Sequence, residues 1–186
     1  MKKHIISLTG DLAAGKSRVT DLLQKELNYS IYRNGEKFRA LGMEMGMSVN
    51  EFSIYAETHP EIDMKLESEA TKYSKTNDNF IIDAKMGWYA IPESFKVYLK
   101  VDADVGAKRA YDDVKRKNSE NFDSVEEYKV HMLARYNSEN ERYFNLYGVR
   151  KDDMSNYDLV IDTTYLTIEE VKQKILEEYT KWLATD

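Results

Sequence analysis

Residues 10–17 of the chain read Gly10-Asp11-Leu12-Ala13-Ala14-Gly15-Lys16-Ser17. They match the pattern Gly-x-x-x-x-Gly-Lys-Ser/Thr, which wraps around phosphate groups. The apolar run at residues 4–8 precedes this stretch, and residues 16–27 repeat valine and leucine at helical spacing. The sequence therefore predicts a buried strand, a phosphate-binding turn and a helix in succession.

Each part of this loop has a physical task in binding a nucleoside triphosphate. Gly10 and Gly15 let the backbone turn tightly, so that its N–H groups and the helix N-terminus face phosphate oxygens. Lys16 supplies a positive charge to the β- and γ-phosphates, and the Ser17 hydroxyl is a ligand for Mg²⁺. The sequence thus predicts ATP and Mg²⁺ as cofactors. The residues predicted to bind them in this segment are Gly10, Asp11, Leu12, Ala13, Ala14, Gly15, Lys16, Ser17 and Arg18.

The rest of the chain alternates short apolar runs with longer periodic segments, which is typical of strand–helix units around a parallel sheet. Strands are expected at residues 4–8, 29–33, 80–82, 97–101 and 159–161. Helix starts are marked by a Ser or Thr with a Glu three residues later, at residues 48–51, 124–127 and 167–170. This alternation predicts an α/β fold of three layers, with a parallel sheet of about five strands and helices on both faces.

Length and composition narrow the class of protein. The 186 residues suit one well-cored domain, residues 1–186, and the net charge of −6 argues against a general nucleic-acid binder. The chain has no cysteine, which excludes disulfides, thiolate metal sites and cysteine nucleophiles. No apolar run approaches the roughly 20 residues that cross a bilayer. We expect a cytoplasmic monomer whose partners are small-molecule nucleotides, with neither nucleic acid nor membrane among them.

Further charged residues fit phosphoryl transfer. Asp83 directly follows the apolar run 80–82. At the end of a strand, its carboxylate can face the metal or the waters of the metal. Arginines in a closing lid stabilise the charge that develops on the transferred group, and the segment from 105 to 147 carries Arg109, Arg116, Arg135 and Arg142. The last two lie seven residues apart and so share one face of a helix. The predicted catalytic residues are Lys16, Asp83, Arg135 and Arg142, and the predicted metal ligands are Ser17 and Asp83.

The phosphate loop alone leaves the reaction open. A GTPase would need a guanine-reading Asn-Lys-x-Asp, which the chain lacks, and motor or transport ATPases are usually much larger. A small-molecule kinase fits the length of the chain. Its acceptor could be a phosphate, or a hydroxyl for which Asp83 could serve as the base.

Five segments resemble the short, archaeal-type cytidylate kinases, and together they extend over nearly the whole chain. They are the phosphate loop, residues 35–39 (Gly-Glu-Lys-Phe-Arg), residues 46–63, residues 135–148 and residues 153–163 (Asp-Met-Ser-Asn-Tyr-Asp-Leu-Val-Ile-Asp-Thr). The resemblance implies a P-loop kinase fold with strand order 2-3-1-4-5. It also implies transfer of the ATP γ-phosphoryl group to a nucleoside monophosphate, with CMP or dCMP as the favoured acceptor.

The resemblance also implies roles for particular segments. Gly35, Phe38 and Arg39 would open the monophosphate site, with Arg39 clamping the acceptor phosphate. Helices at about 36–70 would bind the acceptor, and a helical lid would extend over about 112–142.

Paired arginines of the lid in this family bridge the donor and acceptor phosphates, and these match Arg135 and Arg142. Arg109 would lie near the ATP base and phosphates. Lys85 would bind the acceptor where the family generally has an arginine, although lysine cannot make the bidentate contact of arginine. Ala13 replaces a usual glycine of the loop.

Two other interpretations stay open at this point. The chain could be another small-molecule kinase with the same loop, such as a dephospho-coenzyme A or sugar kinase. It could also be a non-catalytic nucleotide-binding protein, a reading that the departures at Ala13 and Lys85 make conceivable.

Overall fold

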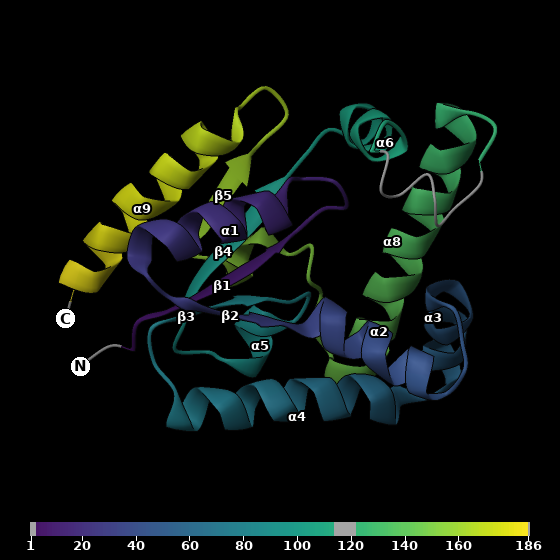
Figure 1. Ribbon diagram of the computed structural model, residues 1–186, viewed down its shortest axis with the longest axis horizontal. Helices are drawn as coiled ribbons and strands as arrows, with labels where there is room; N and C mark the ends of the chain where they lie inside the picture. Colours follow the sequence, from purple (N-terminus) through teal and green to yellow (C-terminus); the bar gives the residue numbers. More distant parts are fainter. Residues whose placement is uncertain (1–2, 114–121, 186) are drawn as a thin grey trace.

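A parallel sheet of five strands forms the centre of the molecule in the computed structural model, which describes residues 3–113 and 122–185 (Figure 1). The strands are β1 (Ile5–Gly10), β2 (Ser30–Arg33), β3 (Phe80–Asp83), β4 (Phe95–Lys100) and β5 (Leu159–Asp162). Their order is β2-β3-β1-β4-β5, and every neighbouring pair is parallel. The predicted α/β fold and strand order 2-3-1-4-5 are confirmed.

Helices cover both faces of this sheet. They are α1 (Lys16–Leu27), α2 (Asn34–Glu44), α3 (Val49–Thr58), α4 (Pro60–Thr76), α5 (Gly87–Ala90), α6 (Ala103–Tyr111), α8 (Val125–Tyr147) and α9 (Ile168–Ala184), with a 3₁₀ turn at Met154–Asn156. Figure 1 shows α1 and α9 on one face and α4 and α5 on the other. Strand residues are therefore buried from both sides, which explains why the strands read as continuous apolar runs.

The core on the α1 and α9 side is the larger one. Val19 and Leu23 of α1 meet Val171 and Ile175 of α9, and all four side chains are fully buried among residues of the strands. The start of α9 is fixed by Thr167, which caps the first turn in a reciprocal pair with Glu170. Apolar spacing and capping signals are local features of the sequence, so the ends of these elements were predictable from it.

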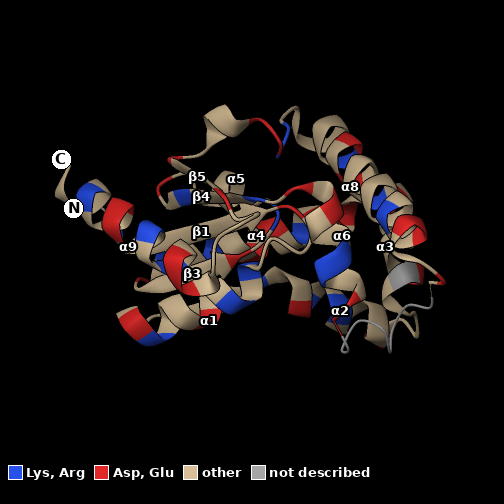
Figure 2. Cartoon of the chain, turned by 90° about the horizontal axis from the view of Figure 1, so that it is seen from above, with Lys and Arg blue, Asp and Glu red and all other residues tan. Residues whose placement is uncertain are grey.

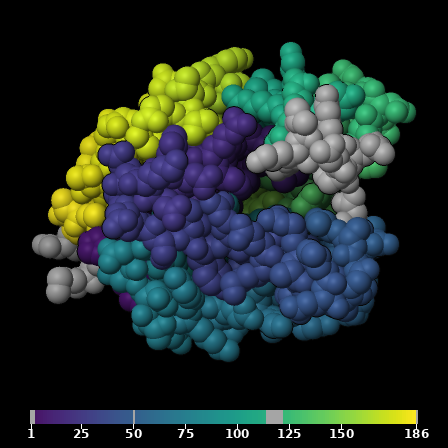
Figure 3. All heavy atoms as spheres, in the orientation of Figure 1, coloured from purple at the N-terminus to yellow at the C-terminus, as the bar shows by residue number. Residues whose placement is uncertain are grey.

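Two groups of helices extend beyond the carboxyl edge of the sheet. Helices α2, α3 and α4 overlap the expected acceptor-binding segment 36–70, and α8 continues past the expected end of the lid at residue 142. Part of that lid, with Arg116, lies outside the described residues. Figure 3 shows the surface hollowed between α1, α2 and α8. The phosphate loop lies at this hollow because it joins β1 to α1.

Positively and negatively charged residues are interspersed along the helices (Figure 2). Lys and Arg share α8 and α9 with Asp and Glu, so neither helix carries charge of one sign only. Among the described helices, none has the length and apolar composition needed to cross a membrane.

Candidate active site

The loop at residues 10–15 has the tight backbone that its sequence predicts. A side chain at Gly10 would place its Cβ 2.3 Å from the carbonyl oxygen of Leu99, so only glycine fits there. Gly15 has a φ of 89° and Ala13 a φ of 61°, both in the left-handed region. Left-handed backbone is costly for a residue with a Cβ, so Ala13 holds this conformation against its own preference.

Lys16 folds back over the loop that carries it. Its Nζ donates hydrogen bonds to the carbonyl oxygens of Gly10, at 3.0 Å, and of Asp11, at 2.9 Å. Burial lowers the pKa of Lys16, while the nearby carboxylate of Asp83 raises it. The ammonium group is thus held at the mouth of the loop, within the field of a carboxylate.

Asp83 lies at the carboxyl end of β3, beside the end of β1. Arg33 approaches it from β2, with Nη1 3.6 Å from Oδ2. Burial raises the pKa of Asp83, although the charges of Lys16 and Arg33 oppose this effect. Ser17, in the first turn of α1, is exposed. A partly buried carboxylate and an exposed hydroxyl at this edge fit Mg²⁺, which usually keeps several waters and takes one or two protein ligands beside phosphate oxygens.

Other residues of the loop anchor it to its surroundings. The carboxylate of Asp11 accepts hydrogen bonds from the Tyr98 hydroxyl, at 2.6 Å, and from the backbone N–H of Val101, at 2.9 Å. Its side chain therefore ties the loop to the end of β4 and leaves its backbone for the phosphates. Leu12 and Ala13 pack against α6 and α8, and Ala14 is buried.

The two arginines predicted to lie near ATP, Arg109 and Arg18, differ in their contacts. Arg109 donates from Nη2 to the carbonyl oxygens of Thr163 and Thr164, at 3.1 and 2.8 Å. It thereby holds the turn between β5 and α9 beside the phosphate loop. Arg18 is exposed on α1 and makes no hydrogen bond to another described residue.

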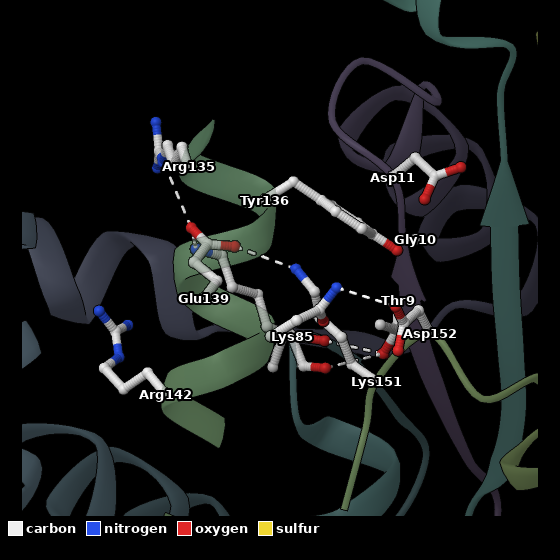
Figure 4. A network of polar contacts seen from close by, with 12 residues as sticks. Thr9, Gly10, Asp11, Lys85, Arg135, Tyr136, Glu139, Arg142, Lys151 and Asp152 are labelled. Carbon is white, nitrogen blue, oxygen red and sulfur yellow. Dashed lines mark hydrogen bonds and ion pairs between the residues drawn. The ribbon is translucent and has the colours of Figure 1, made fainter. Parts of the chain in front are cut away.

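A buried carboxylate on α8 gathers three cations across the hollow (Figure 4). Glu139, 4% exposed, pairs with Lys85, with Lys151 at 3.0 Å and with Arg135 at 3.2 Å. These charges hold the pKa of Glu139 well below its usual range although burial opposes them. Burial lowers the pKa of Lys85 to about 8, with Glu139 opposing and Arg135 and Lys151 adding to the effect.

The remaining predicted acceptor residues are spread over α2 and α8. Arg142 pairs with the buried Asp63 of α4, with 2.8 Å between Nε and Oδ2. Arg39 is exposed and has no hydrogen bond or ion pair with another described residue. Gly35 lies one turn before it, and a Cβ there would come within 3.6 Å of its guanidinium. Phe38 packs on Phe52, with ring centroids 4.6 Å apart, so the structure places its ring in the core between α2 and α3.

Several residues of this site were missed by sequence reasoning. Glu139 and Lys151 pair inside the molecule, and Asn34 donates from Nδ2 to Oε2 of the buried Glu67 at 3.2 Å. In the sequence, Glu139 and Lys151 lie in or next to a run of charged residues that is typical of a solvated helix face. Glu139 and Lys151 differ from residues of a solvated face because they are buried, and their burial cannot be predicted from the sequence around them.

Comparison with known proteins identifies the family. The protein-family model described as "Cytidylate kinase" matches residues 46–181 of the chain. The chain belongs to the cytidylate kinase family. It is 36% identical to a cytidylate kinase of Thermoplasma volcanium over 176 residues, which are 92% of this chain and 88% of that one. The chain is therefore a phosphotransferase of the cytidylate kinase family, and this family uses ATP.

Two further similarities extend this result. An S-adenosylmethionine-dependent nucleotide dehydratase of Lacinutrix mariniflava is 32% identical over 96% of this chain, but the match spans only 36% of that protein. The fold is similar to that of shikimate kinase from Bacteroides thetaiotaomicron, with a TM-score of 0.64 over 93% of this chain and 96% of the other. At 14% identity, this second similarity concerns the fold alone.

Proposed function

We propose that the protein transfers the γ-phosphoryl group of Mg·ATP to CMP or dCMP, giving ADP and the nucleoside diphosphate. One structural observation supports the proposal in addition to the family membership. Figure 4 shows Gly10 and Asp11 of the phosphate loop opposite a second set of cations, Lys85, Arg135 and Arg142. The charges of Lys151 and Glu139, which belong to that cluster, act on Lys16. Two phosphate-bearing ligands that meet end to end would fit such an arrangement.

The proposed mechanism rests on position and charge. Lys16 leaves the carbonyl oxygens of the loop for the β- and γ-phosphates, and the loop's N–H groups hold the β-phosphate. Lys85 and Arg39 hold the acceptor phosphate in line with the γ-phosphorus. Arg135 and Arg142, on one face of α8, neutralise the charge that spreads over the transferred group. The acceptor phosphate is already a nucleophile at neutral pH, so this reaction needs no general base.

Mg²⁺ would be held by Ser17 and, directly or through water, by Asp83, and would supply positive charge to the β- and γ-phosphates. Arg33, next to Asp83, keeps the carboxylate oriented toward this edge of the sheet. Closure of α8 over the hollow would exclude water and limit hydrolysis of ATP. Arg109 would fix the turn after β5 against which the ATP base lies.

Release of ADP from Mg·ATP, measured against CMP, dCMP, UMP, AMP and GMP, tests the proposal. Turnover should be fastest with CMP or dCMP. Lys16→Ala should abolish turnover with every acceptor, and Lys25→Ala, an exposed lysine in the last turn of the same helix, serves as the matched control. Turnover only with dephospho-coenzyme A or a sugar would refute a phosphate acceptor. ATP binding without turnover of any acceptor would support a non-catalytic nucleotide-binding protein instead.

A further inference from the structure

Two buried polar atoms near Glu67 have no hydrogen-bond partner among the described residues. They are Asn34 Oδ1, whose side chain contacts Glu67 through Nδ2, and Tyr147 Oη, on which the charge of Glu67 acts. A buried polar group without a partner is costly, and native structures contain few of them. Asn34 is 7% exposed and begins α2, five residues before Arg39. Unpaired groups at this place suit a polar ligand.

Glu67 of α4 lies between these groups, because it accepts a hydrogen bond from Asn34 and its charge acts on Tyr147. Glu67 is 7% exposed, and the one hydrogen bond that its carboxyl group makes to a described residue is the one that Oε2 accepts from Asn34. Burial raises the pKa of Glu67 to about 8, and the neighbouring charge of Asp63 adds to the effect, while Asn34 and Lys85 oppose it. The carboxyl group therefore keeps its proton at neutral pH. Because Oε2 accepts from Asn34, Oε1 is left to carry that proton as a hydrogen-bond donor.

Asn34 has a defined orientation in this pair. Its Nδ2 is used by Glu67, so the amide must face the other way with Oδ1, which is an acceptor only. The two residues together present an acceptor, Asn34 Oδ1, next to a donor, the Glu67 hydroxyl. Lys85 lies near enough to this pair for its charge to act on Glu67.

The nucleobases differ in what they offer to such a pair. The Watson–Crick edge of cytosine has an amino N–H donor next to a ring nitrogen acceptor, and adenine has the same two groups. Uracil and guanine have the reverse, a carbonyl acceptor next to a ring N–H donor. A carbonyl oxygen facing Asn34 Oδ1 would leave two acceptors in contact, which a buried site strongly disfavours.

We propose that Asn34 and Glu67 select the base of the acceptor nucleotide by binding an amino group and its neighbouring ring nitrogen. Asn34 Oδ1 accepts from the amino group, and the Glu67 hydroxyl donates to the ring nitrogen. This inference rests on the proposed function, since it names the base-reading part of the same acceptor site. Cytosine is favoured over uracil by this pair, and the size of the site decides between cytosine and adenine.

Other ionisable groups face Glu67 and must be considered in any pH experiment. They are Asp63 from the same helix, Lys85 from the turn after β3, Tyr32 from β2, and Tyr143 and Tyr147 from α8. Burial raises the pKa of each of the three tyrosines above its ordinary value. Burial moves the pKa of Glu67 and that of Lys85 to about 8, so these two groups titrate in the same range. A variant at Glu67 separates the two.

The test compares kcat/KM for CMP, UMP and AMP in three variants. In Glu67→Leu the ratio of CMP to UMP should fall roughly 10- to 100-fold, the value of one good base-reading pair. Glu67→Gln should keep the ratio, because its amide still accepts from Asn34 and still donates to the ring nitrogen. Glu69→Gln, two residues along α4 on the surface and paired with Lys37, is the matched control and should leave all three substrates unchanged.

The pH dependence gives a second readout that does not depend on the leucine variant folding. Wild-type kcat/KM for CMP should fall above pH 8, as Glu67 loses its proton, relative to Glu67→Gln under the same conditions. Parallel profiles of the two proteins would overturn the inference, as would an unchanged CMP-to-UMP ratio in a folded Glu67→Leu. An equal loss with all three nucleotides would overturn it too. If the wild type phosphorylates no nucleoside monophosphate at all, the proposed function itself fails.

Discussion

Replacement of Glu67 by Gln should make the protein more stable at alkaline pH relative to the wild type. Glu67 is 7% exposed and accepts one hydrogen bond, from a neutral amide. Its carboxyl group therefore keeps its proton in the folded protein at a pH where the unfolded chain has lost it. Folding in this range takes up a proton, so stability falls as the pH rises.

The structure sets the size of this effect. The carboxyl pKa is raised from its usual 4.5 to about 8 by burial, with the charge of Asp63 as the second cause. Between these two values the wild type loses about 1.4 kcal/mol of stability for each pH unit, or about 5 kcal/mol in all. Below pH 4 both states hold the proton and the loss is absent. Glutamine has no proton to lose, so Glu67→Gln escapes the whole decline.

Urea unfolding of both proteins from pH 5 to pH 9 measures this difference. We expect the free energy of unfolding of Glu67→Gln minus that of the wild type to increase steadily with pH and to level off above pH 8. Any constant cost of the amide shifts this curve without changing its slope. A difference that stays flat from pH 5 to pH 8 would refute the reasoning, because it would mean that Glu67 is ionised in the folded protein.

Three other substitutions test other parts of the site. Arg39→Ala should raise KM for the acceptor monophosphate roughly 10- to 100-fold and leave KM for ATP nearly unchanged, as one charge-assisted contact is lost; an equal loss for both would contradict the assigned acceptor role. Gly10→Ala would put a Cβ 2.3 Å from the carbonyl oxygen of Leu99, so we expect a loss of about 1–3 kcal/mol in thermal unfolding and weaker ATP binding, and unaltered stability would count against the close approach. Glu139→Gln should cost about 3–5 kcal/mol in urea unfolding, because it removes the anionic partner of buried cations; a cost under about 1 kcal/mol would show that the ion pairs are not formed in solution.

The sheet and the phosphate loop were predictable because their signals are local. The helix at 16–27 was predicted with the bounds that α1 has in the structure, and the strand order followed from the family resemblance. The positions of Asp83 at the end of β3 and of Lys16 at the start of α1 were also predictable, since each follows a strand. Features that depend only on residues close together in the sequence could be predicted in this way.

The ion-pair cluster around Glu139 and the proposed base-reading pair of Asn34 and Glu67 each join residues that are far apart in the chain. Lys85 and Glu139 are 54 residues apart, and Asn34 and Glu67 are 33 apart. A glutamate in a charged segment has the same sequence signature whether it is buried or solvated, so its partners cannot be derived from spacing. Only packing decides which of the many carboxylates loses its water, and packing is a property of the whole fold.

The lysine at position 85 makes physical sense in combination with Glu139. Without nucleotide, Glu139 balances the cations that the proposed reaction would direct to phosphates. Lys151 is 3% exposed, and its Nζ lies 4.4 Å from the centre of the Tyr136 ring and 3.0 Å from Glu139 Oε2, so it is held beside this carboxylate. Lys85 is 37% exposed and makes a single-point contact, which an incoming phosphate can replace more easily than a bidentate arginine pair. A lysine here therefore suits an exchange between Glu139 and the acceptor phosphate, with Lys151 keeping Glu139 compensated after Lys85 has left.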